Sequence, residues 1–204
     1  MPLHFKGFGK VLGNKEILSP IDLTINENEI VAIQADMEHM NAFLSLIQED
    51  RSYLTNELMM NGQSLQGCEA LFMYRSTMGE YNRLTPEQHV RFWCDLYNEN
   101  VDIDSVLTLT ELDHIRNKKS KRLTISEKKR LQFARSLLQN TTIFIFQEPT
   151  YQIDLQSKQV FNRVLNELRK KNAMVIVFTS SLEEGIRMAT KVFRLNSRAY
   201  KKLN

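Results

Sequence analysis

The stretch from Ile33 to Phe43, IQADMEHMNAF, joins a strand-like apolar run to a helix-like segment, and junctions of this kind bind phosphate in many proteins. A phosphate loop needs glycines so that successive backbone N–H groups can face phosphate oxygens. It also needs a lysine for the terminal phosphates and a hydroxyl residue for Mg²⁺. The stretch contains no glycine, lysine, serine or threonine. Its residue types therefore predict that phosphate-loop chemistry is absent.

Glu148 is the other residue whose type and position could do chemistry. It follows the apolar run 141–146, TTIFIF, and a carboxylate at the end of a buried strand can serve as a general base. The alternative interpretation is a residue that only forms the turn after the strand. No metal-ligand spacing supports a metal site, since the histidines are scattered at His4, His39, His89 and His114. We expect no bound metal.

Alternating strand and helix patterns place the stretch 33–43 and Glu148 at the ends of predicted strands. Residues 16–33 alternate apolar and polar side chains around a turn, which predicts strands, and apolar residues at helical spacing follow over 40–47. The apolar runs 143–146 and 174–178 are typical of strands buried on both faces of a parallel sheet. A helical pattern follows each run, so the sequence predicts an α/β fold.

The middle of the chain, about residues 77–125, is polar and is predicted to be a helical insertion. Thr85 is expected to cap a helix, with Pro86 in its first turn and Gln88 completing a capping box. Ser126 is expected to cap the next helix.

Composition excludes several classes of protein. The 204 residues are 42% hydrophobic and 25% charged, with a net charge of +3, as in an ordinary soluble globular domain. This charge is too small to indicate a nucleic-acid partner. No apolar run approaches the ~20 residues of a membrane-spanning helix, and the first residues show no signal-peptide core. The isolated Cys68 and Cys94 fit a reducing cytosol.

The segment 123–154, LTISEKKRLQFARSLLQNTTIFIFQEPTYQID, resembles the region from signature to D-loop in ATP-binding subunits of ABC transporters. That family reads roughly LSGGQ-x-QR-x-x-x-ARAL, four apolar residues, DEPT and a D-loop. YNRLTPEQHVRFW, VIVFTSSLEEG and KEILSPIDLTINENEIVAI resemble further family segments in the family's order. The resemblance covers nearly the whole chain and is strongest to short bacterial subunits of peptide or antibiotic export and self-immunity.

This resemblance implies a P-loop NTPase fold in a single ABC-type nucleotide-binding domain over residues 1–204. The expected parts are a RecA-type α/β core, an N-terminal antiparallel β subdomain and a helical subdomain at about 77–130.

The family's nucleotide-binding positions align with this sequence without a gap, and at most of them this chain has a residue type that differs from the family's. They are Ala35, Glu38, Met40, Asn41 and Ala42 for Walker A, Gln147 for Walker B, Leu123, Thr124, Ile125, Ser126 and Glu127 for the signature, and Ser180 for the switch histidine. The Q-loop glutamine falls near Ser76 and the adenine-stacking aromatic near Leu12. Among the charged positions of the site, only Glu148, a remnant catalytic carboxylate, and the D-loop Asp154 keep the family's residue.

These changes imply a subunit that binds neither ATP nor Mg²⁺ and catalyses nothing. Glu38 would add a negative charge beside a polyanion, and two unit charges ~4 Å apart repel by ~4 kcal/mol at an effective dielectric of ~20. A new ligand site at Glu38, Met40 and Asn41 is one interpretation. The interpretation that we favour is a set of ordinary residues in the first turn of a helix.

The resemblance implies a structural or regulatory member of a membrane transport complex, peripheral on the cytoplasmic face. Its partners would be a transmembrane permease subunit and a second ABC ATP-binding subunit, as homo- or heterodimer, with no nucleic acid. One alternative is a residual ATPase that drives export with ATP and Mg²⁺. Another is a soluble adaptor no longer tied to transport.

Two surfaces are candidates for these partners. The family's permease inserts a short helix into a groove that Met78, Tyr81 and Trp93 would line here, although these residues could instead only pack the helical part onto the core. The basic segment 116–130 could contact anionic lipid or nucleic acid, but a solvated helix face is the favoured interpretation.

Overall fold

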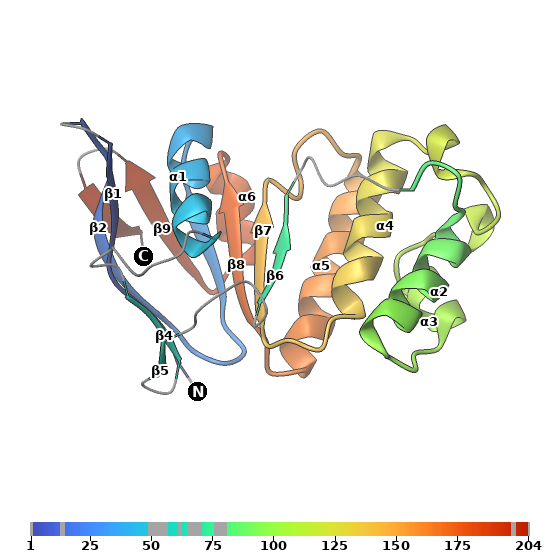
Figure 1. The fold of residues 1–204 in the computed structure, drawn as a ribbon. Coiled ribbons are helices and arrows are strands. Elements are labelled where there is room, and N and C mark those ends of the chain that lie inside the picture. The colour runs from blue at the N-terminus through green and yellow to red at the C-terminus, as the bar shows by residue number, and fades with distance from the viewer. Residues whose placement is uncertain are drawn as a thin grey trace.

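The structure is a computed structural model, and it describes residues 2–12, 15–48, 57–60, 63–64, 71–75, 81–196 and 199–203. Two sheets lie side by side with one helix between them, and a block of helices covers the far face of the larger sheet (Figure 1). Within the described ranges, no helix is both long and apolar enough to cross a membrane.

The smaller sheet is antiparallel and comes from the N-terminal part of the chain. Its strand order is β2-β1-β4-β5, with β1 at Leu3–Leu12, β2 at Lys15–Ile25, β4 at Glu57–Met60 and β5 at Gln63–Ser64. Phe5 and Phe8 both point into the core although simple alternation would put them on opposite faces. A register shift between them, with Gly7 at a φ of 59°, makes this possible because glycine adopts positive φ without strain.

The larger sheet has the order β10-β9-β3-β8-β7-β6, and its neighbouring strands are parallel except that β10 runs antiparallel to β9. Its strands are β3 at Ile30–Gln34, β6 at Leu71–Tyr74, β7 at Ile143–Gln147, β8 at Met174–Thr179, β9 at Lys191–Asn196 and β10 at Ala199–Leu203. Every residue of β7 and β8 is buried, which explains their continuous apolar sequences.

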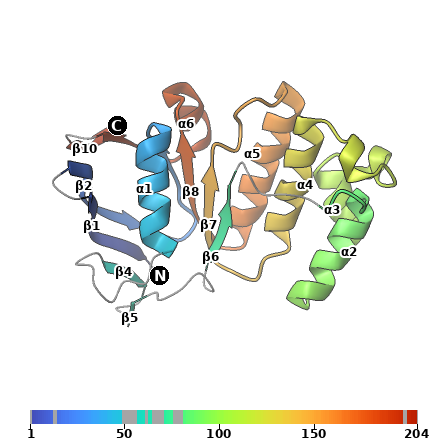
Figure 2. The ribbon, with the colours of Figure 1, turned by 45° about the horizontal axis from the view of Figure 1, so that its top comes forward.

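Helix α1, Met37–Gln48, lies between the two sheets (Figures 1 and 2). The ring of Phe43 is 5.3 Å from that of Phe5, 4.8 Å from that of Phe8 and 5.0 Å from that of Phe178, measured between centroids. One helix side chain therefore links both sheets.

The other face of the large sheet is covered by α4, Ile125–Leu137, and α5, Leu155–Lys170. Helices α2, Pro86–Tyr97, and α3, Ile103–Leu109, pack outside them, with short 3-10 turns at Asp113–Ile115 and Ser120–Arg122 (Figure 2). Helix α6, Leu182–Met188, follows β8. The described residues 81–138 contain no strand. A subdomain boundary near 77 stays a prediction, because residues 76–80 lie outside the described ranges.

The expected start of α2 is confirmed, and that of α4 is wrong. Thr85 caps α2, Pro86 is its first residue and Gln88 completes the capping box. At α4, however, Thr124 and not Ser126 is the N-cap, because Glu127 stands three residues after Thr124 and completes a capping box with it.

Candidate functional site

The junction between β3 and α1 is a closed helical turn. The helix begins at Met37, so only Ala35 and Asp36 separate it from the strand. The N–H of Ala35 donates to the carbonyl of Thr179 at 3.1 Å, and the N–H of Met40 donates to the carbonyl of Asp36 at 3.0 Å. Backbone groups that would have to face phosphate oxygens are therefore engaged inside the protein.

Asp36 caps this turn with its own carboxylate. Its Oδ1 accepts from the backbone N–H of His39 at 2.9 Å and lies 2.6 Å from Nδ1 of the same residue. The His39 N–H, more than any other contact, holds the pKa of Asp36 below its usual value. A helix N-terminus favours an anion, and here the anion comes from the chain itself. Sequence analysis missed Asp36, although an aspartate before a helical pattern is a common cap signal.

Asn41 and Gln147 form a neutral amide pair between α1 and β7. Nε2 of Gln147 donates to Oδ1 of Asn41 at 2.8 Å and lies 3.3 Å from the sulfur of Met37. Gln147 is only 4% exposed. The positions that the resemblance assigns to the Walker A lysine and the Walker B aspartate are thus joined by a hydrogen bond between two neutral amides.

The remaining positions that the resemblance assigns to Walker A behave as ordinary residues of a helix. Met40 is fully buried and Ala42 nearly so, both in the core beneath α1, whereas Glu38 is exposed on the first turn. Acidic residues are favourable there because of the helix dipole.

Glu148 forms the turn after β7 and reaches across to the turn after β8. Its backbone has a φ of 47°, and its side chain is buried. Its Oε1 accepts from the backbone N–H of Ser180 at 2.6 Å, and its own N–H donates to the carbonyl of Phe178 at 2.9 Å. Ser180 contributes only its backbone to this contact. The bonding of Glu148 is that of a turn-forming residue.

Lys129 is a buried cation that sequence analysis assigned to a solvated helix face, and that assignment is wrong for it. Only 8% of the residue is exposed, and its Nζ donates to the carbonyl of Glu148 at 3.2 Å and to that of Tyr151 at 2.5 Å. Burial lowers the pKa of Lys129, although the nearby Glu148 opposes the shift. Lys129 lies four residues before the buried Phe133, a spacing that indicates a shared helix face.

The start of α4, where the resemblance places the signature, is also capped from within. The Thr124 hydroxyl accepts from the Glu127 N–H at 3.2 Å, and Glu127 Oε2 accepts from the Thr124 N–H at 2.7 Å and from Lys118 Nζ at 2.9 Å. Burial acts to raise the pKa of Glu127, but these donors hold it below its usual value. Leu123 is buried and Ile125 is 60% exposed.

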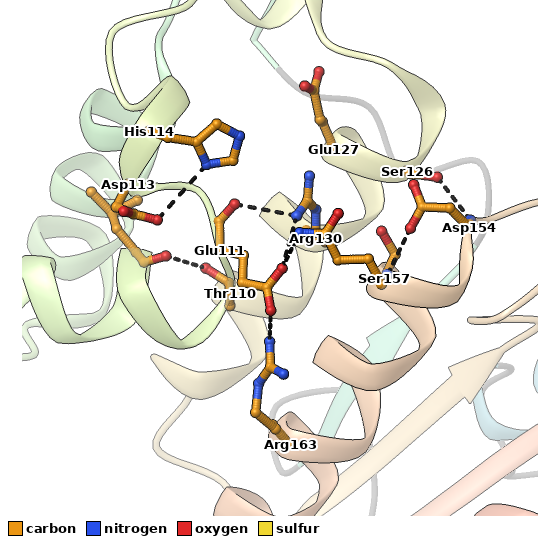
Figure 3. Close-up of polar contacts among 12 residues, drawn as sticks. Thr110, Glu111, Asp113, His114, Ser126, Glu127, Arg130, Asp154, Ser157 and Arg163 are labelled. Atoms are coloured by element: carbon orange, nitrogen blue, oxygen red, sulfur yellow. Dashed lines mark hydrogen bonds and ion pairs between the residues drawn. The ribbon is translucent and has the colours of Figure 1, made fainter.

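Asp154 and Ser126 connect the starts of α4 and α5 (Figure 3). The backbone N–H of Asp154 donates to the Ser126 hydroxyl at 3.1 Å, and Asp154 Oδ1 accepts from the Ser157 N–H at 2.7 Å as the N-cap of α5. The D-loop position thus acts here as a helix cap.

Glu111 binds three side chains and links the end of α3 to α4 and α5 (Figure 3). Its carboxylate contacts Arg163 and Gln156 and lies 3.5 Å from Arg130 Nη1, which also donates to the Glu111 carbonyl at 3.2 Å. The Arg130 side chain is 5% exposed, so this second buried cation also departs from the expected solvated face. Burial acts to raise the pKa of Glu111, but the donors from Gln156 and Arg163 lower it.

Replacing Glu111 by glutamine is expected to lower the free energy of unfolding by about 1–2 kcal/mol at pH 7, because Arg130 loses its charged acceptor. A carboxylate with a lowered pKa stabilises the fold above its unfolded pKa of ~4.3, and that contribution is lost as pH falls through the folded value. The difference between parent and Glu111→Gln should therefore shrink below about pH 4, which urea titrations at several pH values measure.

The exposed neighbour Asp113 provides the matched control. Asp113→Asn should change stability by less than ~0.5 kcal/mol. A Glu111→Gln variant as stable as the parent at pH 7 would contradict a stabilising role for this cluster.

Within a single copy of the chain, the predicted site positions do not all lie close to one another. The starts of α1 and α4 lie toward opposite ends of the upper edge in Figure 1, with the turns after β7 and β8 between them. The predictions at Ser76 and Met78 lie outside the described residues, as does the side chain of Leu12. Among the described residues, no His, Cys, Asp and Glu side chains gather as metal ligands would.

The expected groove residues separate into two environments. Tyr81 is 58% exposed and stacks edge-on against Phe92, with 5.3 Å between ring centroids. Trp93 is only 3% exposed, between the ring of His89 and the guanidinium of Arg135. This burial agrees with the alternative that Trp93 packs within the helical part, because the capped register of α2 turns the side chain inward. Leu96, 58% exposed, shares the outer face with Phe92.

Several proteins of known role are similar to this chain in sequence. The cytochrome c biogenesis ATP-binding export protein CcmA of Reclinomonas americana is 24% identical over 178 residues, which cover 83% of this chain and 80% of that protein. The zinc import ATP-binding protein ZnuC of Hydrogenovibrio crunogenus is 24% identical, over 94% of this chain and 77% of its own. The maltose/maltodextrin import protein MalK of Mannheimia succiniciproducens is 25% identical over 96% of this chain, which spans only 55% of MalK.

Solved structures show the same fold. An ATP-binding subunit of an ABC transporter superposes with a TM-score of 0.82 at 16% identity, over 100% of this chain and 90% of its own. An ATP-binding cassette in its ADP conformation superposes with a TM-score of 0.79 at 11% identity, over 100% of this chain and 92% of its own. No protein-family model matches the sequence.

The fold is therefore that of a P-loop NTPase of the ABC ATPase type, as the sequence predicted. The chain is a homologue of the ATP-binding subunits of ABC transporters.

Proposed function

We propose that this chain is a catalytically inactive homologue of an ABC transporter ATP-binding subunit. Its role is structural or regulatory, within a membrane transport complex. The observation that carries this proposal is the neutral hydrogen bond between Gln147 Nε2 and Asn41 Oδ1 at 2.8 Å, in place of a charged pair. A magnesium nucleotide requires a cation for its phosphates and hard anionic oxygen ligands for its metal. The amide pair supplies neither.

The closed first turn of α1 adds a second barrier. To wrap a phosphate, this turn would have to unwind, which would expose the fully buried Met40 and release the Asp36 cap. Exposing such a side chain costs about 1.5–3 kcal/mol, and losing a cap costs about 1 kcal/mol. A phosphate at the helix N-terminus returns only about 0.3–1 kcal/mol. Mg·ATP therefore does not fit this junction, and the closed turn is the favoured state.

Glu148 does not restore an active site. A general base needs a positioned water and an activated phosphoryl group, and this carboxylate is hydrogen-bonded to the Ser180 backbone. We expect no turnover from a carboxylate that caps a neighbouring turn.

Relatives of this kind generally work with transmembrane permease subunits and often dimerise. We therefore assign to this chain a peripheral position on the cytoplasmic face of the membrane, bound to a permease. The relatives named above act in export and in import, so they favour no single substrate. The likeness to peptide or antibiotic export and self-immunity subunits rests on the sequence resemblance alone.

Calorimetry with millimolar Mg·ATP tests the proposal. We expect no saturable heat, which means a Kd above about 1 mM, or binding weaker than about −4 kcal/mol. An ATP-binding subunit with an intact phosphate loop, titrated under the same conditions, gives the positive control. A Kd below about 1 mM would overturn the assignment as a subunit that does not use nucleotide.

A further inference from the structure

A cavity of about 480 Å³ lies at the edge of the large sheet where β7 begins, the lower edge in Figure 1. Its wall combines the link between α2 and α3, the end of α4, the loop 139–142 that leads into β7, and Lys171 at the end of α5. The positions that the resemblance assigns to nucleotide lie at the other edge of the sheet. The volume is in the range of about 300–1,000 Å³ that is usual for small-molecule sites.

Two side chains of opposite charge line this cavity, Glu99 from the α2–α3 link and Lys171 from α5. Among the described residues, the carboxylate of Glu99 has no ion-pair or hydrogen-bond partner, so it does not pair with Lys171. The Lys171 ammonium donates to the Leu137 carbonyl at 2.8 Å. An ammonium has three N–H donors, so two remain for a ligand.

The backbone holds both charged residues in place. Asn98 ends α2 in the left-handed conformation, with a φ of 53°, and the N–H of the next residue, Glu99, donates to the Cys94 carbonyl at 2.9 Å. Lys171 caps the end of α5, and its N–H donates to the Leu168 carbonyl at 3.0 Å. Two opposite charges therefore face one cavity without neutralising each other.

Gln139 contributes a hydrogen-bond donor that lacks an acceptor. Its Nε2 is buried in the wall of the cavity, and no group of the described residues accepts from it. Buried polar groups normally have a partner, so an unpaired one indicates a place for a water molecule or a ligand. Gln139 follows Leu137, whose carbonyl binds Lys171, by two residues. The amide and the ammonium are therefore near each other.

The rest of the wall is partly apolar. Val101, Leu137 and Leu138 provide aliphatic side chains, and the last two are only 7% and 1% exposed. A small aliphatic group can pack against them. The end of α4 also carries the partial negative charge of a helix C-terminus, which favours a ligand ammonium and adds to the effect of Glu99.

We propose that this cavity binds a free amino acid with an aliphatic side chain. The ligand carboxylate accepts from Lys171 and Gln139, the ligand ammonium binds Glu99, and the aliphatic group packs against the apolar wall. A ligand with only one of the two charges leaves the opposite wall charge unpaired or faces a like charge, so it binds less well. The cavity shares no residue with the β3–α1 junction, so failure of this inference leaves the proposed function intact.

The first test compares three ligands at pH 7 without nucleotide, by calorimetry and by the rise in melting temperature that binding to the folded state produces. The ligands are L-leucine, leucinamide, which lacks the carboxylate, and 4-methylpentanoate, which lacks the ammonium. We expect a Kd below about 1 mM for L-leucine and at least about tenfold weaker binding of the other two. No binding of L-leucine means that water alone fills the cavity and overturns the proposal. Equal binding of all three ligands overturns the recognition of both charges.

The second test removes the negative wall charge. Glu99→Gln should weaken L-leucine binding at least about tenfold and abolish the preference for L-leucine over 4-methylpentanoate, since the ligand ammonium then has no counter-charge. Asp95→Asn is the matched control, because Asp95 is an exposed carboxylate of α2 that does not line the cavity. It should leave both affinities unchanged. Equal melting temperatures without ligand show that both variants fold, and an unchanged preference in Glu99→Gln overturns the role of this residue.

The third test removes the positive wall charge. Lys171→Met should weaken L-leucine binding and abolish the preference for L-leucine over leucinamide, whereas Lys170→Met, its neighbour outside this cavity, should retain that preference. Lys171 also binds the Leu137 carbonyl, so a lower melting temperature of Lys171→Met is expected, and the preference between ligands is the readout. If Lys171→Met still prefers L-leucine over leucinamide, the ligand carboxylate does not bind there and the proposed orientation is wrong.

Discussion

Replacing Gln147 by aspartate is expected to lower the free energy of unfolding by about 2–4 kcal/mol, although aspartate is the residue that an ABC ATPase carries there. Gln147 is 4% exposed and donates to Asn41, so the variant buries a carboxylate without a cation beside it. Leaving a buried charge uncompensated costs about 3–5 kcal/mol. Rotation of the Asn41 amide supplies one hydrogen bond and offsets part of this loss. Urea unfolding measures the change.

A double-mutant cycle measures the interaction energy between residues 41 and 147 apart from the effect of each change on its other neighbours. Asn41→Lys alone should cost less than about 1 kcal/mol, because residue 41 is exposed and its ammonium can stay in solvent while one hydrogen bond to Gln147 is lost. The double variant Asn41→Lys/Gln147→Asp should recover at least about 1 kcal/mol relative to the sum of the single changes. Additive losses, or a Gln147→Asp protein as stable as the parent, would show that the two amides do not depend on each other.

Neither Asn41→Lys nor the double variant is expected to hydrolyse ATP. Groups that stabilise a transition state act as a unit, and restoring one or two leaves the rest of the site incomplete. The first turn of α1 would still be closed, Glu148 would still bind the Ser180 backbone, and Glu127 would still occupy the start of α4. Turnover above background in Asn41→Lys would contradict this view of the site.

Tyr81→Glu combined with Leu96→Glu is expected to abolish co-purification with a membrane partner from detergent extracts. Both side chains are 58% exposed. Leu96 lies on the outer side of α2, and Tyr81 precedes this helix and contacts its Phe92. Central aromatic and apolar residues of an interface each contribute about 2–4 kcal/mol, so charging two of them should reduce affinity by a factor of about 1,000 or more. Western blotting of the extracted complex provides the measurement.

The same experiment requires proof that the protein stays folded. Because neither side chain is buried, the melting temperature of the double variant should stay close to that of the parent. Ile186→Glu, with equal exposure on α6, controls for an added surface charge and should keep the complex. If the complex survives in Tyr81→Glu/Leu96→Glu, the docking surface lies elsewhere.

Regular patterns allowed the fold to be predicted from the sequence. The fully apolar runs at 143–146 and 174–178 are the buried parallel strands β7 and β8, and the capping box at Thr85 begins α2 as expected. Periodicity and capping are local properties, so one sequence suffices to recognise them.

Predictions that depended on tertiary contacts succeeded less often. Lys129 and Arg130 were expected in solvent because lysine and arginine usually are, but backbone carbonyls and Glu111 provide buried acceptors. For Trp93 the sequence left open a groove or a packed position, and the register of α2 buries the side chain. The link between Asn41 and Gln147, 106 positions apart, cannot be inferred from spacing, because only the packing of α1 on the sheet makes them neighbours.

The Asn41–Gln147 hydrogen bond also bears on how such a chain can evolve. A return to aspartate at 147 puts one unmatched charge into a buried place, so this first step makes a less stable protein, whereas residue 41 is exposed and accepts a lysine in solvent. Proteins sit close to a stability threshold, and selection removes variants that fall below it. Reversal is then open in one order only, with lysine at 41 before aspartate at 147, together with a reopened helical turn. A lineage that acquires the amide pair thereby loses one of the two direct routes back to nucleotide binding through its own folding stability, even if ATP hydrolysis would benefit its descendants.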